Sequence, residues 1–358
     1  MIRRSEIFAE RRLPRQLLHR ESELQQLSRS LQPALRGERP EDVLITGPSG
    51  VGKTTLARFL LDNPDNSRAP AGVDSTVLQA MGETTGQLLR DAINAHPSGV
   101  DVHRGVPVDD LPGILRDAVD DPYVVILDEA DDVPDSDIID AFASVPGVAI
   151  IAIAHDPSDW LARIDQQYRA QFDGEHHLEL GAYETDEIVD ILRPRAELGL
   201  EPGTVDDAHL EAIGDVVGGR ARNAIQTLKC AAMLAGERDH EAVTDRDIVD
   251  GRQQAQREIR ESSLASLTMH HQILYEIVRA AEPLKSTELH ERYEAVADRA
   301  YAGHPPTEIG RRARTLKLQK LREYGLVEWE DHEDNSRTYR VVDGTIGADI
   351  DVPLVSRR

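Results

Sequence analysis

The sequence is poor in several residue types, and each shortage excludes a class of protein. It contains one cysteine, Cys230, which excludes an intrachain disulfide and any metal site built from several cysteines. Aromatic residues make up 4% of the chain, so the core has to be built from aliphatic side chains. The longest uninterrupted apolar run, 148–154, is far too short to cross a bilayer, and no apolar leader follows the charged N-terminus. We therefore expect a cytoplasmic protein that does not bind membranes.

Lysine is also scarce. Five lysines stand among 41 basic residues, the rest being arginine, and 65 acidic residues give a formal net charge of −24. An acidic surface with little lysine is typical of proteins that work in molar salt, where the Debye length falls to about 3 Å and self-repulsion is weak. The alternative is an ordinary acidic protein from a GC-rich genome, which explains arginine in place of lysine but not the excess of carboxylates. In both cases net charge does not exclude nucleic-acid binding.

The first half of the chain alternates between apolar segments and segments of helical pattern. With 358 residues, the protein is long enough for two or three domains. An amphipathic helix is expected from Glu21, with Leu24, Leu27, Leu31 and Leu35 on one face. The alternation then predicts an α/β domain with a parallel five-stranded sheet covered on both faces. Its strands are expected at 43–46, 75–79, 123–128, 148–154 and 177–180.

The second half has a different pattern. No strand signal appears between Tyr183 and about Gln254, where four helices are expected at 185–198, 206–217, 222–235 and 244–256. A polar connecting helix or linker at 252–263 leads to expected helices at 270–281, 286–300 and 307–324, and to strands at 326–329 and 338–342. The sequence therefore predicts an α/β domain, an all-helical domain, a third domain and a tail, at 1–181, 182–261, 262–345 and 346–358.

A phosphate-binding loop follows the first expected strand. The pattern Gly-x4-Gly-Lys-Ser/Thr predicts an ATP or ADP site, because glycines let backbone N–H groups surround phosphates at a helix N-terminus. Lys53 is expected to reach the outer phosphates, and the Thr54 hydroxyl is expected to bind Mg²⁺. The predicted nucleotide-binding residues are Gly47, Pro48, Ser49, Gly50, Val51, Gly52, Lys53, Thr54 and Thr55.

The third expected strand ends in two acids. Asp128 is expected to hold the Mg²⁺, because an apolar strand ending in an acid supplies the second half of such a site. Glu129 is expected to be catalytic as the general base that polarises the attacking water. The alternative is that Glu129 is one more acid in the run from Asp128 to Asp132.

Several motifs then match one family in order. They are the segments 14–21, 35–40, 128–131, 183–189 and 219–224, followed by a winged-helix pattern. The chain resembles the archaeal replication initiators related to origin recognition complex subunit one and cell division control protein six, over residues 7 to about 342. The resemblance implies an AAA+ ATPase with a helical lid and a winged helix. It also implies binding to double-stranded DNA at origin repeats, loading of the replicative helicase, and contact with other initiator copies.

The resemblance implies further nucleotide-site residues. Tyr183 opens the lid motif, and Arg222 matches the lid arginine called sensor 2, although Arg220 stands where the family usually has Asp. His155 stands where the family has the Asn called sensor 1. A neutral imidazole there can hold a water or a phosphate oxygen, and a plain loop histidine is the alternative.

The arginine finger is the weakest match to the family. Arg169 or Arg163 is expected to reach the nucleotide of a neighbouring copy, but Gln171 stands where the family has a second basic residue. Glutamine cannot replace a guanidinium charge. We therefore expect slow hydrolysis and a long-lived bound nucleotide, which makes the protein a switch more than a motor.

The last expected helix is basic within an acidic chain. As the third helix of a winged domain it is expected to bind DNA, whereas a solvated helix face is the alternative. A register with Leu318 and Leu321 in the core turns Arg312 and Lys320 away from it. The candidate DNA contacts are Arg311, Arg312, Arg314, Lys317, Lys320 and Arg322 on this helix and Arg337 near the wing.

Two other functions fit the same folds. One is a DNA-dependent remodelling ATPase, which would need intact finger and sensor residues. The other is an auxiliary paralogue that regulates transcription or plasmid maintenance without loading a helicase. The sequence favours the initiator, because the order of its motifs is that of the initiator family.

Overall fold

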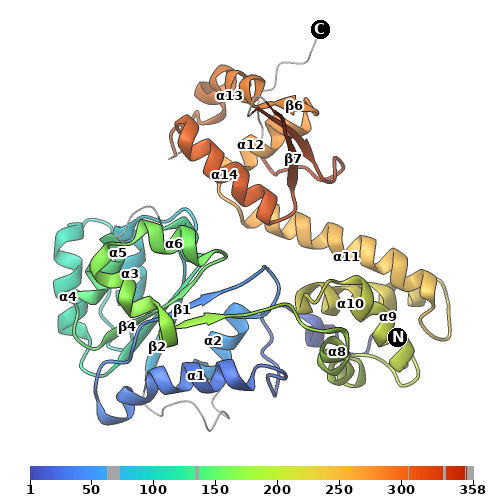
Figure 1. Ribbon diagram of the computed structural model, residues 1–358, viewed down its shortest axis with the longest axis horizontal. Helices are drawn as coiled ribbons and strands as arrows, with labels where there is room; N and C mark the ends of the chain where they lie inside the picture. The colour runs from blue at the N-terminus through green and yellow to red at the C-terminus, as the bar shows by residue number, and fades with distance from the viewer. Residues whose placement is uncertain (63–72, 134–136, 305, 334–335, 351, 353–358) are drawn as a thin grey trace. The chain divides into compact units, whose positions relative to one another are not determined.

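The computed structural model describes the chain except residues 63–72, 134–136, 305, 334–335, 351 and 353–358. The chain divides into two compact units, Met1–Ile248 and Val249–Arg358. The first unit contains both the expected α/β domain and most of the expected helical domain (Figure 1). Among the described residues, no helix is long and apolar enough to cross a membrane.

The sheet of the first unit confirms the predicted α/β architecture. Five parallel strands lie in the order β2-β3-β4-β1-β5. Every residue of β3 and β4 is buried, which is why both strands appear in the sequence as continuous apolar runs. The strand bounds are β1 Val43–Thr46, β2 Asp74–Gln79, β3 Tyr123–Asp128, β4 Val148–Ile153 and β5 His177–Glu179.

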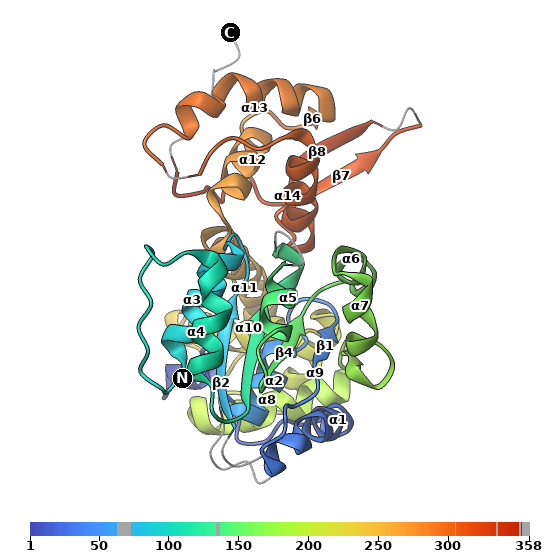
Figure 2. The same cartoon turned by 90° about the vertical axis from the view of Figure 1, so that its left-hand side faces the viewer.

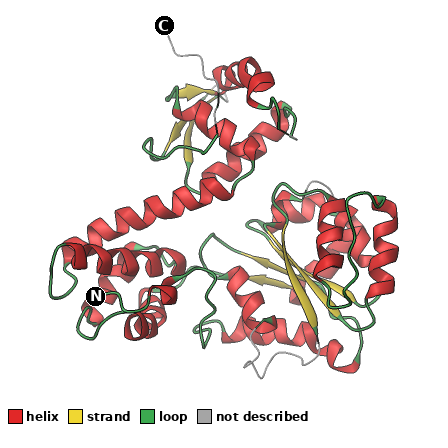
Figure 3. Cartoon of the chain, turned by 180° about the vertical axis from the view of Figure 1, so that it is seen from behind, coloured by secondary structure: helices red, strands yellow, loops and turns green. Residues whose placement is uncertain are grey.

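Helices cover both faces of this sheet (Figure 3). On one face α1 (Glu21–Leu31) and α2 (Lys53–Leu61) pack through Leu24, Leu27 and Leu31. Leu35 was expected on the same face, but it lies in a 3-10 turn after α1 and is exposed. The other face is covered by α3 (Thr85–Ala95), α4 (Leu111–Ala118) and α5 (Asp137–Ala143).

Two short helices follow β4, and they complete the packing at one end of the sheet (Figure 2). These are α6 (Pro157–Arg163) and α7 (Gln166–Arg169). Trp160 on α6 is buried, and its ring meets that of Phe172 edge to face with the centroids 4.8 Å apart. This pair closes the core beneath the loop that leads into β5.

The helical part of the first unit includes the N-terminal arm. Its helices are α8 (Thr185–Gly199), α9 (Asp207–Val216) and α10 (Ala221–Glu237). Ile7 and Phe8 are buried in the same apolar cluster as these helices, although the first helix or strand expected from the sequence begins only at Glu21. A methyl group added at Gly199 would lie 2.6 Å from the Phe8 ring, so glycine is required where the arm crosses the end of α8. The arm is therefore part of the lid core.

The expected polar connection between domains is helical. A single helix, α11, runs over Asp245–Ser266 and includes the whole segment 252–263. Its polar face carries pairs one turn apart, such as Arg257 with Glu261 at 2.9 Å, which support a helix with little apolar surface. The division between the two units falls inside this helix, after Ile248.

The second unit confirms the expected winged-helix pattern of three helices and a small antiparallel sheet. The sheet order is β6-β8-β7. The last helix begins at Arg311, after Gly310, and not at Thr307. The elements are α12 Met269–Arg279, β6 Leu284–Lys285, α13 Ser286–Ala300, α14 Arg311–Glu323, β7 Val327–Asp331 and β8 Arg337–Val341.

The start of the expected tail is packed against α12. Ile346 is buried, and the Tyr275 hydroxyl donates to its carbonyl oxygen at 3.0 Å. The Ala348 N–H donates to the Glu276 carboxylate at 2.7 Å. The packed part of the second unit therefore extends to residue 348, past the boundary expected at 345.

Asp247 fixes the connection between α10 and α11, and it yields the first prediction. Its buried carboxylate accepts hydrogen bonds from Arg238, His240 and both the N–H and hydroxyl of Thr244, at 2.7–2.9 Å. Burial alone would raise its pKa, but these hydrogen bonds outweigh burial and hold the pKa well below the usual value. The carboxylate therefore contributes stability above the unfolded-state pKa of about 3.9, and this contribution is lost as pH falls through the lower folded-state pKa.

We expect Asp247→Asn to lower the free energy of unfolding by about 2 kcal/mol at neutral pH, because it weakens charge-assisted hydrogen bonds to a buried group. The difference from wild type should shrink as the pH falls below about 4. Urea titrations at several pH values would measure it. Asp245→Asn, at an exposed acid in the same turn, is the control and should change stability little. Equal losses of stability in the two variants would contradict this account.

Candidate nucleotide and DNA sites

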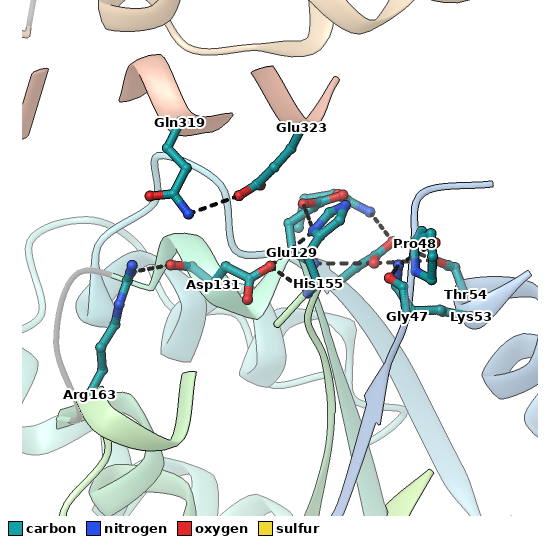
Figure 4. A network of polar contacts seen from close by, with 12 residues as sticks. Gly47, Pro48, Lys53, Thr54, Glu129, Asp131, His155, Arg163, Gln319 and Glu323 are labelled. Atoms are coloured by element: carbon teal, nitrogen blue, oxygen red, sulfur yellow. Dashed lines mark hydrogen bonds and ion pairs between the residues drawn. The ribbon is translucent and has the colours of Figure 1, made fainter. Parts of the chain in front are cut away.

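The loop between β1 and α2 has the geometry of a phosphate cradle. Gly47, Gly50 and Gly52 all have positive φ, at 139°, 83° and 97°. A methyl group at Gly47 would lie 2.2 Å from the carbonyl oxygen of Leu180, so no larger residue fits there. The Lys53 ammonium is buried within the loop, where it donates to the carbonyl oxygens of Gly47 at 2.6 Å and Pro48 at 3.0 Å (Figure 4).

Asp128 lies beside Thr54 at the end of β3. The Thr54 hydroxyl is 3.1 Å from both carboxylate oxygens, and the Gln79 amide donates to one of them at 3.2 Å. Burial, and then the charge of Glu129, raise the pKa of Asp128, while its hydrogen bonds lower it in part. A hydroxyl and a carboxylate with an unfavourably buried charge are oxygen ligands of the kind that suit Mg²⁺. The two residues predicted to hold the metal therefore lie together.

Glu129 has a strained backbone. Its φ and ψ are 57° and 43°, in the left-handed region that is costly for a residue with a side chain. The chain turns sharply there, directly after β3, and the Glu129 N–H donates to the Asp128 carboxylate at 3.1 Å. The two acids expected to act on the nucleotide thus leave the strand end in fixed and different positions.

His155 lies beside both Glu129 and Asp131. Asp131 was not among the predicted site residues. The backbone N–H and Nδ1 of His155 lie 2.8 and 3.0 Å from the same carboxylate oxygen of Asp131 (Figure 4). Nδ1 is also 3.6 Å from the Glu129 carboxylate. Ligand atoms of these three residues lie within 4.8 Å of one another, close enough to share a cation. The sequence signals for Asp131 were its place in the acidic run that begins at the end of β3 and its place in the 128–131 motif.

The beginning of the lid packs against the same loop. The Tyr183 hydroxyl accepts a hydrogen bond from Arg20 at 3.1 Å, and it would lie 3.7 Å from a methyl group at Gly52. The Arg20 guanidinium also stacks on the Tyr183 ring, 4.0 Å from its centroid. A methyl group at Gly219 would lie 2.3 Å from the Tyr183 carbonyl oxygen, so the turn before α10 depends on glycine. Arg20 belongs to the 14–21 motif but was not predicted as a site residue.

Arg222 stands directly above the phosphate loop. Its N–H donates to the Gly50 carbonyl oxygen at 3.2 Å, and its Cβ would lie 3.2 Å from a methyl group at Gly50. Its Nε donates to the Glu10 carboxylate at 2.7 Å. The structure therefore brings the expected sensor 2 arginine to the loop through backbone contact.

The two finger candidates contact their own chain. Arg169 Nε donates to the Ile164 carbonyl oxygen at 3.3 Å, and the Arg163 guanidinium donates to the carbonyl oxygen of Asp131 (Figure 4). Arg163 thereby holds the short turn that carries Asp131. Whether either arginine reaches a neighbouring copy stays a prediction.

The expected core register of α14 is confirmed. Leu318 and Leu321 are buried, whereas Leu316 is 42% exposed. Arg312 faces outward, as the register requires, and Arg311 is exposed beside it. Lys317 and Arg322 also keep exposed surface.

Two of the expected DNA contacts on α14 are buried. Arg314 is 5% exposed; its guanidinium stacks 4.3 Å from the Tyr293 ring centroid and bonds the Glu294 carboxylate at 3.3 Å. Lys320, expected to face away from the core, is 4% exposed, and its ammonium lies 5.4 Å from the centroid of the Tyr324 ring. A buried arginine that is stacked on an aromatic ring and paired with a carboxylate is not displayed for a phosphate, so Arg314 leaves the set of accessible cations.

The tryptophan of the wing, Trp329, is flanked by two arginines. The guanidiniums of Arg322 and Arg337 lie 4.4 and 4.8 Å from the centroid of the Trp329 ring. Arg337 is also paired with Asp331 at 2.8 Å. Stacking holds both cations in fixed positions at one end of the small sheet.

Comparisons with known proteins match the ATPase domain and the lid. A family model described as an AAA ATPase domain matches residues 16–151, and one described as a Cdc6 AAA+ ATPase-type lid domain matches residues 189–253. ORC1-type DNA replication protein 9 of Halobacterium salinarum is 30% identical over 347 residues, 96% of this chain and 95% of that protein. ORC1-type DNA replication protein 1 of the same organism is 32% identical over 78% of this chain and 91% of its own length.

Two solved structures share the fold. The Aeropyrum pernix ORC1 protein in complex with DNA superposes with a TM-score of 0.68 at 23% identity, covering 98% of this chain and 94% of its own. The Aeropyrum pernix ORC2 protein, solved as ADPNP–ADP complexes, gives a TM-score of 0.62 at 24% identity and covers 96% of this chain and 95% of its own. The sequence relatives at 30% and 32% identity show that the chain belongs to the ORC1/Cdc6-type family of archaeal replication initiators, which are AAA+ ATPases, and its fold agrees with that assignment.

Proposed function

We propose that the protein is an ATP-dependent origin-binding initiator that helps to load the replicative helicase and uses its nucleotide as a switch. The observation that carries the proposal is that four residues from three elements converge on one loop. Lys53 and Thr54 begin α2, Asp128 ends β3, and Arg222 of the lid bonds the loop backbone. Each of these residue types acts on a nucleotide phosphate or its metal in other phosphate-loop ATPases.

The arrangement gives each residue a task. Backbone N–H groups of the loop bind the phosphates, and the Lys53 ammonium neutralises their outer charge. Thr54 and Asp128 would hold a Mg²⁺ ion, which when bound would draw charge from the phosphate oxygens. Glu129 accepts the proton of the attacking water. Arg222 closes the lid over the outermost phosphate.

Slow turnover is the second part of the proposal. Arg163 and Arg169 are engaged with carbonyl oxygens of their own chain, and Gln171 lacks the charge of the family's second finger residue. Without a cation from a neighbour, the transition-state charge is less well stabilised. The bound nucleotide would then persist and report the state of the protein.

Duplex DNA is the proposed macromolecular partner. Arg311 and Arg312 are exposed at the start of α14, and Arg322 and Arg337 are held on Trp329. The Aeropyrum pernix ORC1 protein, which shares this fold, was solved in complex with DNA, and this supports the assignment. We place the protein on the chromosome in the cytoplasm, with origin repeats, the replicative helicase and other initiator copies as its partners.

An auxiliary paralogue that regulates transcription is the alternative. It would use the same winged helix and the same nucleotide site without loading a helicase. Crosslinking the protein to chromosomal DNA and mapping its positions distinguishes the two functions. Occupancy confined to promoters, with none at repeat arrays, would favour the regulator.

Loss of the loop lysine should abolish nucleotide binding. The purified protein is expected to retain ADP or ATP, and Lys53→Ala should carry none, because the outer phosphates lose their cation. Nucleotide released by acid and separated by chromatography gives the stoichiometry. Lys285→Ala, at an exposed lysine in the second unit, is the control and should retain wild-type nucleotide. Stoichiometric nucleotide on the Lys53 variant would refute the assignment of the loop.

Replacing the general base should stop hydrolysis without stopping binding. We expect Glu129→Gln to lower kcat by about 100-fold or more, because the amide cannot accept the water proton. Hydrolysis by the wild type should be slow, and its turnover per molecule should not change with protein concentration. A turnover per molecule that rises steeply with concentration, and collapses in Arg163→Ala or Arg169→Ala, would show a working finger and end the switch interpretation.

DNA binding should depend on the exposed arginines of α14. We expect Arg311→Ala with Arg312→Ala to weaken binding to an origin-like repeat. The negative slope of log K against log salt should become less steep by roughly 0.9 for each phosphate that is no longer neutralised. Fluorescence anisotropy at several salt concentrations measures the slope, with Arg299→Ala on α13 as the control. Equal affinity of the wild type for the repeat and for random duplex, or unchanged affinity in the double variant, would argue against origin binding by this helix.

A further inference from the structure

Glu10 is outside every motif of the sequence, yet the fold places it at the nucleotide site. The arm that carries it is anchored two residues earlier, where Phe8 is buried in the lid core and its carbonyl oxygen accepts a hydrogen bond from Gln226 of α10 at 3.1 Å. Arg3 and Arg4 fix the arm again through N–H bonds to the Gly199 carbonyl oxygen. Glu10 is therefore held next to the beginning of α10, because the arm before it is bonded to both α8 and α10.

The partner of Glu10 is the lid arginine. Arg222 Nε lies 2.7 Å from Glu10 Oε1, and the exposed fractions of the Arg222 and Glu10 side chains are 23% and 45%. In the part of the chain that the structure describes, Glu10 is the one carboxylate paired with Arg222. The other contact of Arg222 is made by its backbone, whose N–H donates to the Gly50 carbonyl oxygen in the phosphate loop. The guanidinium is thus held by a carboxylate, while the backbone of the same residue contacts the loop that is expected to bind phosphates.

We propose that Glu10 is the resting partner of Arg222 and that the outermost phosphate of ATP competes with it, so that Glu10 sets the preference of the site between ATP and ADP. The inference rests on the proposed function, because it takes Arg222 as the residue that meets the third phosphate. Two anions next to one guanidinium repel each other, so binding of the third phosphate is opposed by the carboxylate. ADP lacks that phosphate and leaves the ion pair intact.

The size of the effect on nucleotide affinity follows from the solvent exposure of the Glu10 and Arg222 side chains. An ion pair that is partly exposed on both sides is worth little, and breaking it changes an equilibrium by about two- to fivefold. This is enough to shift a switch, and too small to prevent ATP from binding. The carboxylate would act by favouring the lid arrangement of the ADP-bound state.

The test compares affinities for ADP and for a slowly hydrolysed ATP analogue by calorimetry. We expect Glu10→Gln to tighten binding of the ATP analogue about two- to fivefold while the affinity for ADP stays near the wild-type value. Glu6→Gln is the matched control, since Glu6 lies on the same arm and pairs with Arg4 at 2.9 Å. The control should leave both affinities unchanged.

A double variant isolates the mechanism from any structural effect. In Arg222→Ala, adding Glu10→Gln should produce no further change in the ratio of the two affinities, because the competing carboxylate has lost its partner. A Glu10→Gln effect that persists without Arg222 would overturn the inference. An unchanged ratio in Glu10→Gln, or weaker binding of the ATP analogue, would overturn it as well.

Failure of the proposed function gives a different result. If the wild type binds neither nucleotide, or Lys53→Ala binds both as well as the wild type does, the nucleotide site itself is wrongly assigned and the inference falls with it. If the wild type binds, Lys53→Ala does not, and Glu10→Gln behaves as the wild type does, the site stands and only the role of Glu10 is refuted.

Discussion

The position of β1 between β4 and β5 is the constraint on which the nucleotide site depends. Because the strands are parallel, their carboxyl ends meet at one edge of the sheet. The phosphate loop leaves β1 there, the acids Asp128 and Glu129 leave β3, and His155 follows β4. Residues far apart in the chain are brought together by strand order alone. The buried centre of the sheet, with every residue of β3 and β4 inside, holds this edge rigid.

Glycine and the N-terminal arm attach the lid to that edge. Gly50 and Gly219 allow the backbone of the lid to approach the phosphate loop and Tyr183 more closely than any side chain would permit. The arm then closes the lid from the other side, with Phe8 in its core and Arg20 on Tyr183. The lid is therefore held by contacts from both before and after the sheet in the sequence, and the nucleotide site has residues from three separate stretches of chain.

Local patterns predicted the parts of the structure that are locally determined. Strands β1, β3 and β4 were found because each is a short apolar run, and the phosphate loop because its glycines, lysine and threonine lie within eight residues. The polar segment 252–263 left a connecting helix and a linker both open; it is a helix, and pairs such as Arg257 with Glu261 support it although few of its residues are apolar. Ile7 and Phe8 were missed because two apolar residues have no period. Asp131 and Glu10 act through partners distant in sequence, and a pattern does not reveal such partners.

For the basic helix α14, the sequence predicted too many functional residues instead of too few. Six cations in one segment look equivalent in the sequence, but Arg314 is stacked on Tyr293 and bonded to Glu294 inside the second unit. Its charge helps to fix where α14 begins, next to Ile309, whose carbonyl oxygen accepts from its Nε at 2.9 Å. Charge counting overestimates the DNA-facing set, because cation–π stacking lets arginine serve as a core residue.

The chain has two tryptophans, and the fold gives one to each unit. Trp160 is enclosed beside Phe172 in the first unit, whereas Trp329 is half-buried between two guanidiniums in the second. An indole in an apolar enclosure and one flanked by cations emit at different wavelengths and quench differently. Each unit thus contains one intrinsic fluorophore. Tryptophan fluorescence of the unmodified chain can therefore distinguish the unfolding of the ATPase unit from that of the winged unit.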